Sequence, residues 1–128
     1  RKEIRRFWNP SDRIFILGDF NDAPESRIRQ ILVDEFQLVD SWKLFHDHEE
    51  SSHHAFNGEC PNGHRIDWIM VDPRVKVLSS ELDKSSRDGK YPSDHYPVIT
   101  KIKINGDFVS QTEVGLKALG RVRDDIGR

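Results

Sequence analysis

The sequence predicts an α+β fold with a largely antiparallel sheet, and three observations support this prediction. Short apolar runs typical of strands recur along the 128 residues, at 13–18, 65–72, 75–82 and 96–104. Helical periodicity is limited to a few segments, of which 25–37 is the clearest. Strands and helices do not alternate regularly, as they would in a sheet built from βαβ units.

The first half of the chain begins with "RKEIRRFW", which is typical of a helix end and is broken by "NPSD". Residues 13–18 predict a buried strand, because an apolar run is bounded there by turn residues. The helix at 25–37 follows Pro24, and its apolar residues recur near a spacing of 3.6, at Ile28, Ile31, Leu32 and Phe36. An extended segment at 38–45 and a polar loop come next.

The second half predicts a short strand at 54–58, a turn at 59–63 and three further strands. The segment 65–72 suits a strand that is buried on both faces except at Asp67. Residues 96–104 alternate as a half-buried strand does, and 83–94 form the preceding loop. We divide the chain into a domain at 1–105 and a tail at 106–128. Within the tail, apolar residues of 110–128 form one helical stripe that three glycines weaken.

Composition excludes several classes of protein. The net charge is −2 and the pI is about 6.3, so the chain has no global basic field to hold nucleic acid. Its single cysteine, Cys60, can form no internal disulfide, which favours a reducing compartment such as the cytoplasm. No apolar run approaches the roughly 20 residues of a membrane span.

Polar residues stand at the ends of apolar strands, where a site could be built. Asp19 and Asn21 follow the first strand, Asp67 lies in an apolar strand, and Asp94 and His95 precede the last one. A carboxylate in an apolar strand is costly to bury without a partner, and His95 is a good candidate for Asp67. We predict that these two side chains lie within about 2.6–3.2 Å of each other. Asp19 and Asp94 could supply oxygen ligands to Mg²⁺.

Each of these motifs also has a structural interpretation. "DFND" could be a polar turn, since Asp and Asn are common in turns. Asp67 could pair with Arg65 instead of His95, and "SDH" could be a helix cap or a loop. The ordered set is harder to explain in this way, because all three motifs lie at or in strands.

In order and spacing, "GDFN", "RIDWI" and "SDHYPV" resemble the later motifs of the endonuclease/exonuclease/phosphatase superfamily. This superfamily includes DNase I-like nucleases, inositol polyphosphate phosphatases, sphingomyelinases and deadenylases. The resemblance covers residues 13–104 and implies half of a four-layered α/β sandwich, with two mixed sheets face to face and helices outside. It implies Mg²⁺-dependent hydrolysis of a phosphoester by water, with Mn²⁺ as an alternative ion.

The resemblance also implies roles for single residues. Asp19 would orient the nucleophilic water and lie with Asp94 at the metal, and Asn21 would position the water or the phosphate. Asp67 would hold His95, and His95 would contact the scissile phosphate. The substrate could be DNA, RNA, a lipid headgroup or a small phosphodiester, and the sequence does not choose among them.

The resemblance is incomplete, because a complete family domain is about twice as long and its first half supplies the main metal-binding Glu. We therefore expect the 128 residues alone to be weak or inactive in catalysis. The strands would expose unpaired edges and an apolar face, which a second copy could cover. The rival hypothesis is a non-catalytic, self-associating or interaction module of the same fold.

A dense group of histidines suggests a third interpretation, a site for Zn²⁺. The group comprises His46, His48, His53 and His54. A solvated loop explains it as well, because no fixed helical spacing unites the four side chains. Phe56, which follows closely, could pack near the site or in the core.

Overall fold

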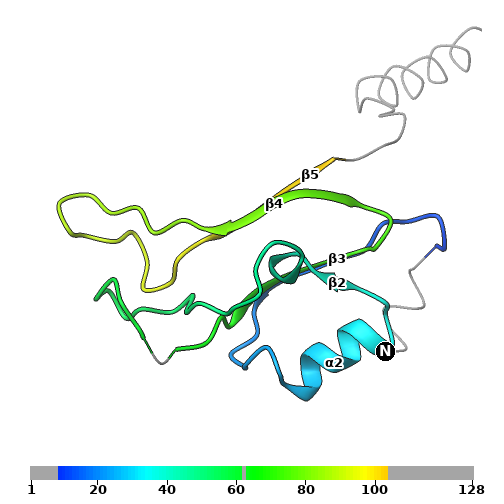
Figure 1. The fold of residues 1–128 in the computed structure, drawn as a ribbon, viewed down its shortest axis with the longest axis horizontal. Helices are drawn as coiled ribbons and strands as arrows, with labels where there is room; N and C mark the ends of the chain where they lie inside the picture. The colour runs from blue at the N-terminus through cyan, green and yellow to red at the C-terminus, as the bar shows by residue number, and fades with distance from the viewer. Residues whose placement is uncertain (1–8, 62, 104–128) are drawn as a thin grey trace, which may run out of the picture.

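The computed structural model describes residues 9–61 and 63–103, so the predictions for 1–8 and for the tail at 106–128 lie outside the described residues. Three layers are visible in Figure 1: a two-stranded sheet, a three-stranded sheet beneath it and a helix below. The elements, in chain order, are β1 (Phe15–Asp19), α2 (Arg27–Asp34), β2 (Val39–Asp40), the 3₁₀ helix η1 (Trp42–Leu44), β3 (Asp67–Val71), β4 (Lys76–Leu82) and β5 (Val98–Lys103).

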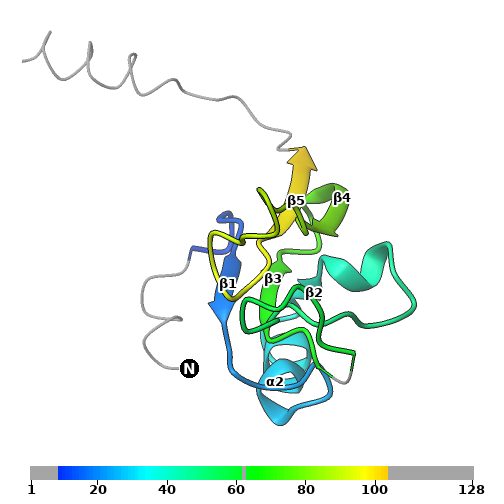
Figure 2. The same cartoon turned by 90° about the vertical axis from the view of Figure 1, so that its left-hand side faces the viewer.

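The three-stranded sheet is antiparallel, with β3 between β1 and β2 (Figure 2). One face of β3 carries Trp68 and Met70, which are fully buried and pack with Leu32 of α2 and with Leu38. Phe20 stacks on Trp68 at 4.4 Å between ring centroids. This core fixes β3 rigidly, and β3 is the strand that begins at Asp67.

The two-stranded sheet consists of β4 and β5, which are antiparallel and joined by the long loop 83–97. Small polar side chains connect it to the other sheet. The hydroxyl of Ser41, which is completely buried, lies 2.8 Å from Oγ1 of Thr100 and 3.3 Å from Oγ of Ser80. These contacts set the two sheets face to face, so the loop before β5 lies beside the start of β3.

The helix α2 is shorter than the predicted 25–37. It begins after Ser26, whose hydroxyl accepts a hydrogen bond from the Arg29 backbone N–H at 3.4 Å. It ends at Asp34, and Gln37 then adopts a left-handed φ of 56° that turns the chain toward β2. Phe36 still packs against the core, which explains why its spacing extended the prediction.

Two predicted elements are wrong. The extended segment 38–45 is strand only at β2, because the Asp40 carboxylate accepts the Trp42 N–H at 3.0 Å and the chain turns into η1. The predicted strand at 54–58 is a turn, since Ala55 and Phe56 have left-handed φ values of 50° and 63°. The first turn has no Gly or Pro to indicate it, whereas the second ends in Asn57-Gly58, with a φ of 76° at Gly58.

The regular secondary structure of the described residues is mostly strand, with one α-helix, as an α+β fold requires, but the predicted four layers and mixed sheets are not seen in this part of the chain. Both sheets there are small and antiparallel. Within residues 9–61 and 63–103, no helix has the length and apolarity needed to cross a membrane.

A buried ionic network lies under the site. Arg65 is fully buried and donates to the carboxylates of Asp40 at 2.7 Å and Glu49 at 3.0 Å. Asp40 also accepts from Arg29 at 3.0 Å. The Arg65 guanidinium donates to the backbone carbonyl of Asp67 at 3.3 Å and not to the Asp67 carboxylate. The alternative pairing of the Arg65 and Asp67 side chains therefore does not occur.

Candidate active site

The side chains of Asp67 and His95 meet where β3, the central strand of the three-stranded sheet, begins. Nδ1 of His95 lies 2.8 Å from Oδ2 of Asp67, within the range predicted from the sequence. The two side chains are 25% and 22% exposed, so the pair is neither sealed in the core nor free in solvent. A carboxylate at Nδ1 fixes the ring orientation and leaves Nε2 for a ligand.

The backbone around His95 is held by a short antiparallel bridge. The His54 N–H donates to the Asp94 carbonyl at 2.8 Å, and the Tyr96 N–H donates to the Ser52 carbonyl at 2.7 Å. These two bonds flank His53 and His95, which therefore form a non-hydrogen-bonded pair with neighbouring side chains. The loop before β5 is thus fixed, although it has no strand of its own.

The charges around His95 favour its protonated form. Its pKa is raised above the ordinary value, first because its ring is hydrogen-bonded to Asp67. Partial burial opposes the rise, whereas the negative charges of Asp67, Asp19 and Asp94 add to it. An imidazolium held in this way is suited to bind an anionic group such as a phosphate.

Asp19 ends β1, the strand next to β3, and Asn21 follows it two residues later. Asp19 is directly opposite Asp67 in the antiparallel register of β1 and β3. Its two carboxylate oxygens accept from the backbone N–H of Asn21 at 2.8 Å and from its side-chain amide at 3.1 Å. Asn21 has a left-handed φ of 51°, and Gly18 has a φ of 149° that residues with a Cβ rarely adopt. The tight turn therefore keeps both polar side chains at the strand end.

Asp94 lies with two histidines in a group that could hold a metal ion. Ligand atoms of His53, Asp94 and His95 all lie within 4.8 Å of one another. Nε2 of His53 is 3.7 Å from Oδ2 of Asp94, and the rings of His53 and His95 meet edge to face at 4.9 Å. Asp19, predicted with Asp94 as a metal ligand, is not a member of this group.

The four loop histidines do not form one cluster. His46 stacks on Trp42 and bonds the Ser80 carbonyl at 2.7 Å, and His48 lies near Asp47 and Glu50. His54 is buried and stacked on Tyr96, and the Gly58 N–H donates to its Nδ1 at 3.3 Å. Among the four, His53 alone joins Asp94 and His95. The sequence did not predict this contact, because His53 and Asp94 are separated by 40 residues and no spacing motif links them.

A cavity of about 260 Å³ lies beside the Asp67–His95 pair. Apolar side chains line much of it, including Leu17, Ile69 and Pro97. Phe56, which could have packed in the core, is 60% exposed and does not line this cavity. The cavity thus combines a polar edge with an apolar wall, as many small-molecule sites do.

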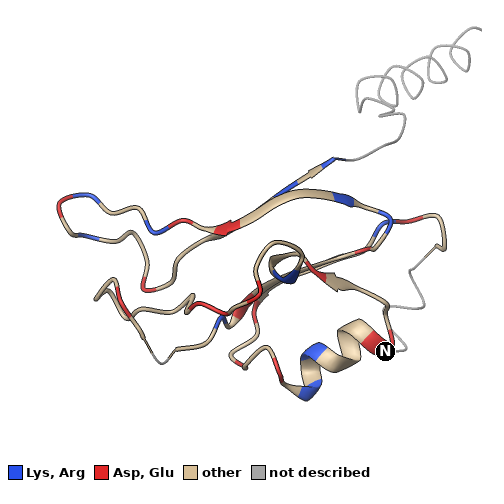
Figure 3. Cartoon of the chain, viewed as in Figure 1, with Lys and Arg blue, Asp and Glu red and all other residues tan. Residues whose placement is uncertain are grey.

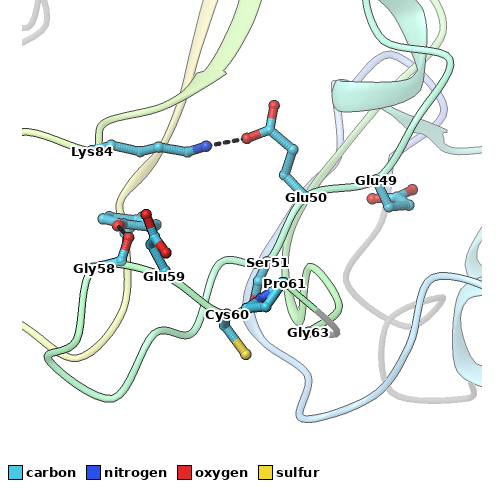
Figure 4. A pocket seen from close by; sticks show the side chains of 10 residues that line it. Glu49, Glu50, Ser51, Gly58, Glu59, Cys60, Pro61, Gly63 and Lys84 are labelled. Carbon is cyan, nitrogen blue, oxygen red and sulfur yellow. Dashed lines mark hydrogen bonds and ion pairs between the residues drawn. The ribbon is translucent and has the colours of Figure 1, made fainter.

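A second cavity, of about 350 Å³, is shown in Figure 4. Glu49, Glu50 and Glu59 line it, with Lys84 paired to Glu50. It contains neither Asp67 nor His95. Lys84 neutralises only part of the negative charge of this pocket. The smaller cavity, which Asp67 and His95 line, is therefore the better candidate for an active site.

Comparison with known proteins shows shared fold but no family. No family model and no curated protein matches the chain. A functionally unknown conserved protein from Enterococcus faecalis is 26% identical, with a TM-score of 0.61, over 71% of this chain and 36% of that one. A mannosyl-6-phosphatase from Bacteroides thetaiotaomicron is 22% identical, with a TM-score of 0.65, over 80% and 42%. The chain therefore shares its fold with about two fifths of the length of these solved structures.

Proposed function

We propose that this chain is part of a metal-dependent phosphoester hydrolase in which Asp67 and His95 bind and stabilise the scissile phosphate. The observation that carries this proposal is the 2.8 Å contact between the two side chains at the end of a rigid strand. The sequence resemblance to the endonuclease/exonuclease/phosphatase superfamily and the fold shared with a mannosyl-6-phosphatase both support it.

In this proposal His95 meets the phosphate through Nε2, since Nδ1 is taken by Asp67. Its positive charge stabilises the negative charge that develops on the phosphate oxygens. Asp19 orients the attacking water, and Asn21 positions that water or the phosphate. Asp67 keeps the ring in place and keeps it charged, so it acts through His95.

The proposed metal ligands are Asp19 and Asp94, and their donor chemistry fits Mg²⁺ or Mn²⁺. Both offer carboxylate oxygens, which hard divalent ions prefer. The hydrogen bonds from Asn21 use only part of the acceptor capacity of the Asp19 carboxylate, so its oxygens can still accept a metal. Such an ion, when bound, polarises the phosphoester and lowers the pKa of bound water.

A small phosphate ester is the substrate class that the described surface favours over nucleic acid. Figure 3 shows basic and acidic residues interspersed along the described chain, and the net charge of the whole chain is −2. Polyanion binding would draw on a concentrated basic surface. A phosphomonoester is the first choice because the structural neighbour is a mannosyl-6-phosphatase.

The proposal is tested by hydrolysis of 4-nitrophenyl phosphate and of the corresponding diester, with Mg²⁺, with Mn²⁺ and with chelator. Any turnover by these 128 residues should be weak, metal-dependent and lost in both Asp19→Ala and His95→Ala. Because the chain matches only part of its structural neighbours, binding of inorganic phosphate is measured in parallel by the NMR signals of His95. A chain that neither hydrolyses the esters nor shifts its His95 signals with phosphate would contradict the proposal.

A second candidate function is a self-associating or interaction module of the same fold. It is favoured by Leu17, which is 66% exposed on β1, one of the two edge strands of the three-stranded sheet that the described residues form. Ile99 on β5 is also exposed. A second copy covering these residues would shield the apolar wall of the smaller cavity, and the sedimentation behaviour of the full chain distinguishes this candidate from a monomeric hydrolase.

A further inference from the structure

We propose that His53, Asp94 and His95 form a binding site for a divalent transition metal, with Asp67 as the hydrogen-bond support for His95. This site differs from the oxygen site proposed for Mg²⁺ in its ligands, since two of the three are imidazoles. It does not depend on the proposed hydrolysis, because the three side chains alone define it.

The backbone places the two histidines side by side. His53 and His95 are directly opposed in the antiparallel bridge, and the bonds that flank them make the pair the type with the closer side chains. Asp94 precedes His95, and its Oδ2 lies 3.7 Å from Nε2 of His53. The site is therefore built from two chain segments that hydrogen bonds already hold together.

The ligand atoms of His53, Asp94 and His95 need to move only slightly closer together to bind one metal ion. A tetrahedral ion with bonds of about 2.1 Å holds its ligand atoms about 3.4 Å apart. The three ligand atoms here lie within 4.8 Å of one another. The side chains of His53 and Asp94 are 42% and 46% exposed, so rotations of these two can bring their ligand atoms together.

The hydrogen bond between His95 and Asp67 also suits a metal. In the neutral ring with its proton on Nδ1, that proton is donated to Asp67 and Nε2 carries the lone pair that a metal needs. A carboxylate on the far nitrogen is the usual companion of a metal-bound histidine, because it fixes the tautomer and strengthens the ligand. Asp67 is thus a positioning residue for this site.

The ligand set determines the class of metal. Imidazole suits Zn²⁺, Ni²⁺, Cu²⁺ and Fe²⁺, whereas Mg²⁺ binds oxygen and seldom imidazole. Asp94 would be shared with the oxygen site, and Nε2 of His95 would be shared with the phosphate. A bound Zn²⁺, Ni²⁺, Cu²⁺ or Fe²⁺ ion would therefore exclude both, so it would inhibit the proposed hydrolysis.

The test uses the full chain, Co²⁺ as the probe, and visible absorption with calorimetry in a buffer free of phosphate. We expect one Co²⁺ per chain, and a loss of affinity by more than about tenfold in both His53→Phe and Asp94→Asn. Asp67→Asn should weaken binding by about tenfold through His95. The matched control is His48→Phe, in the same loop but outside the group, which should bind Co²⁺ as the unaltered chain does.

Unaltered affinity in His53→Phe, or no bound Co²⁺ at all, would overturn the site. So would a loss in His48→Phe, which would assign the metal to the loop histidines. Asp19→Asn separates this inference from the proposed function, because it should abolish hydrolysis yet leave Co²⁺ affinity unchanged. No substrate enters the binding measurement, so failure of one proposal does not hide failure of the other.

Discussion

Arg65 and Asp67 are two residues apart, yet their charged side chains serve two different regions. Arg65 and its partner Asp40 are both 0% exposed, and Glu49 and Arg29 complete their network. Asp67 and His95 remain about one quarter exposed beside a cavity. The difference teaches that pairing alone does not indicate function. In the first region two carboxylates and a backbone carbonyl accept from all three guanidinium nitrogens, whereas in the second a ring nitrogen remains available to a ligand.

The largest expected effect separates the two regions by stability. Arg65→Met leaves Asp40 paired only with Arg29 and Glu49 only with Lys43, and breaking a buried pair of this kind costs about 3–5 kcal/mol. Urea denaturation would measure the loss. Asp67→Asn, at the exposed pair, is the matched control and should cost about 1 kcal/mol or less. Equal losses in the two variants would contradict the distinction.

A smaller loss of stability is expected at Gly18, where a substitution acts through the backbone conformation and not through side-chain contacts. An added Cβ meets no atom within 4 Å, but the φ of 149° is strained for alanine, so Gly18→Ala should destabilise by about 1–2 kcal/mol. Gly89→Ala is the matched control, with a φ of 70° and equally open space in the loop before β5. Both variants should lose stability, but only Gly18→Ala should also impair hydrolysis, because Asp19 follows it.

The two regions should also differ in how their contributions to stability change with pH. The pKa of His95 is raised in the folded chain, so its pairing with Asp67 stabilises the fold fully below the unfolded pKa of about 6.5. This contribution is lost as the pH rises through the raised pKa. His95→Gln should therefore cost up to about 1 kcal/mol near pH 5.5, and less near pH 8.5.

The buried network should show no such change over this pH range, because guanidinium groups do not titrate near neutral pH. The cost of Arg65→Met is thus the internal control for the same two pH values. A cost of His95→Gln that does not decrease with rising pH would show that the pairing with Asp67 does not set the charge of the ring.

The smallest effect on stability is expected at Leu17, on the exposed edge of the site region. Leu17→Lys should change the free energy of unfolding by less than about 0.5 kcal/mol, because the side chain is 66% exposed. If a second copy covers β1, the variant should nevertheless reduce self-association in sedimentation runs. Leu78→Lys, at an exposed position on β4, is the control and should leave association unchanged.

The sequence predicted the strands well because their apolar patterns are local. Residues 65–72 and 75–82 differ from β3 and β4 by no more than two residues at either end. The tertiary contacts were not predictable in the same way. Asp40 carries no local signal that it accepts the Trp42 N–H and binds Arg65, and nothing near His53 indicates its contact with Asp94. The contact between Asp67 and His95 was predictable, because an acidic residue in an apolar strand needs a partner.

The most direct test of the account is the pKa of His95 by side-chain NMR, with and without inorganic phosphate, in the unaltered chain and in Asp67→Asn. We expect the pKa of His95 to lie above the ordinary histidine value, to rise further with phosphate and to fall when Asp67 is replaced. An ordinary pKa that responds neither to phosphate nor to the loss of Asp67 would contradict it.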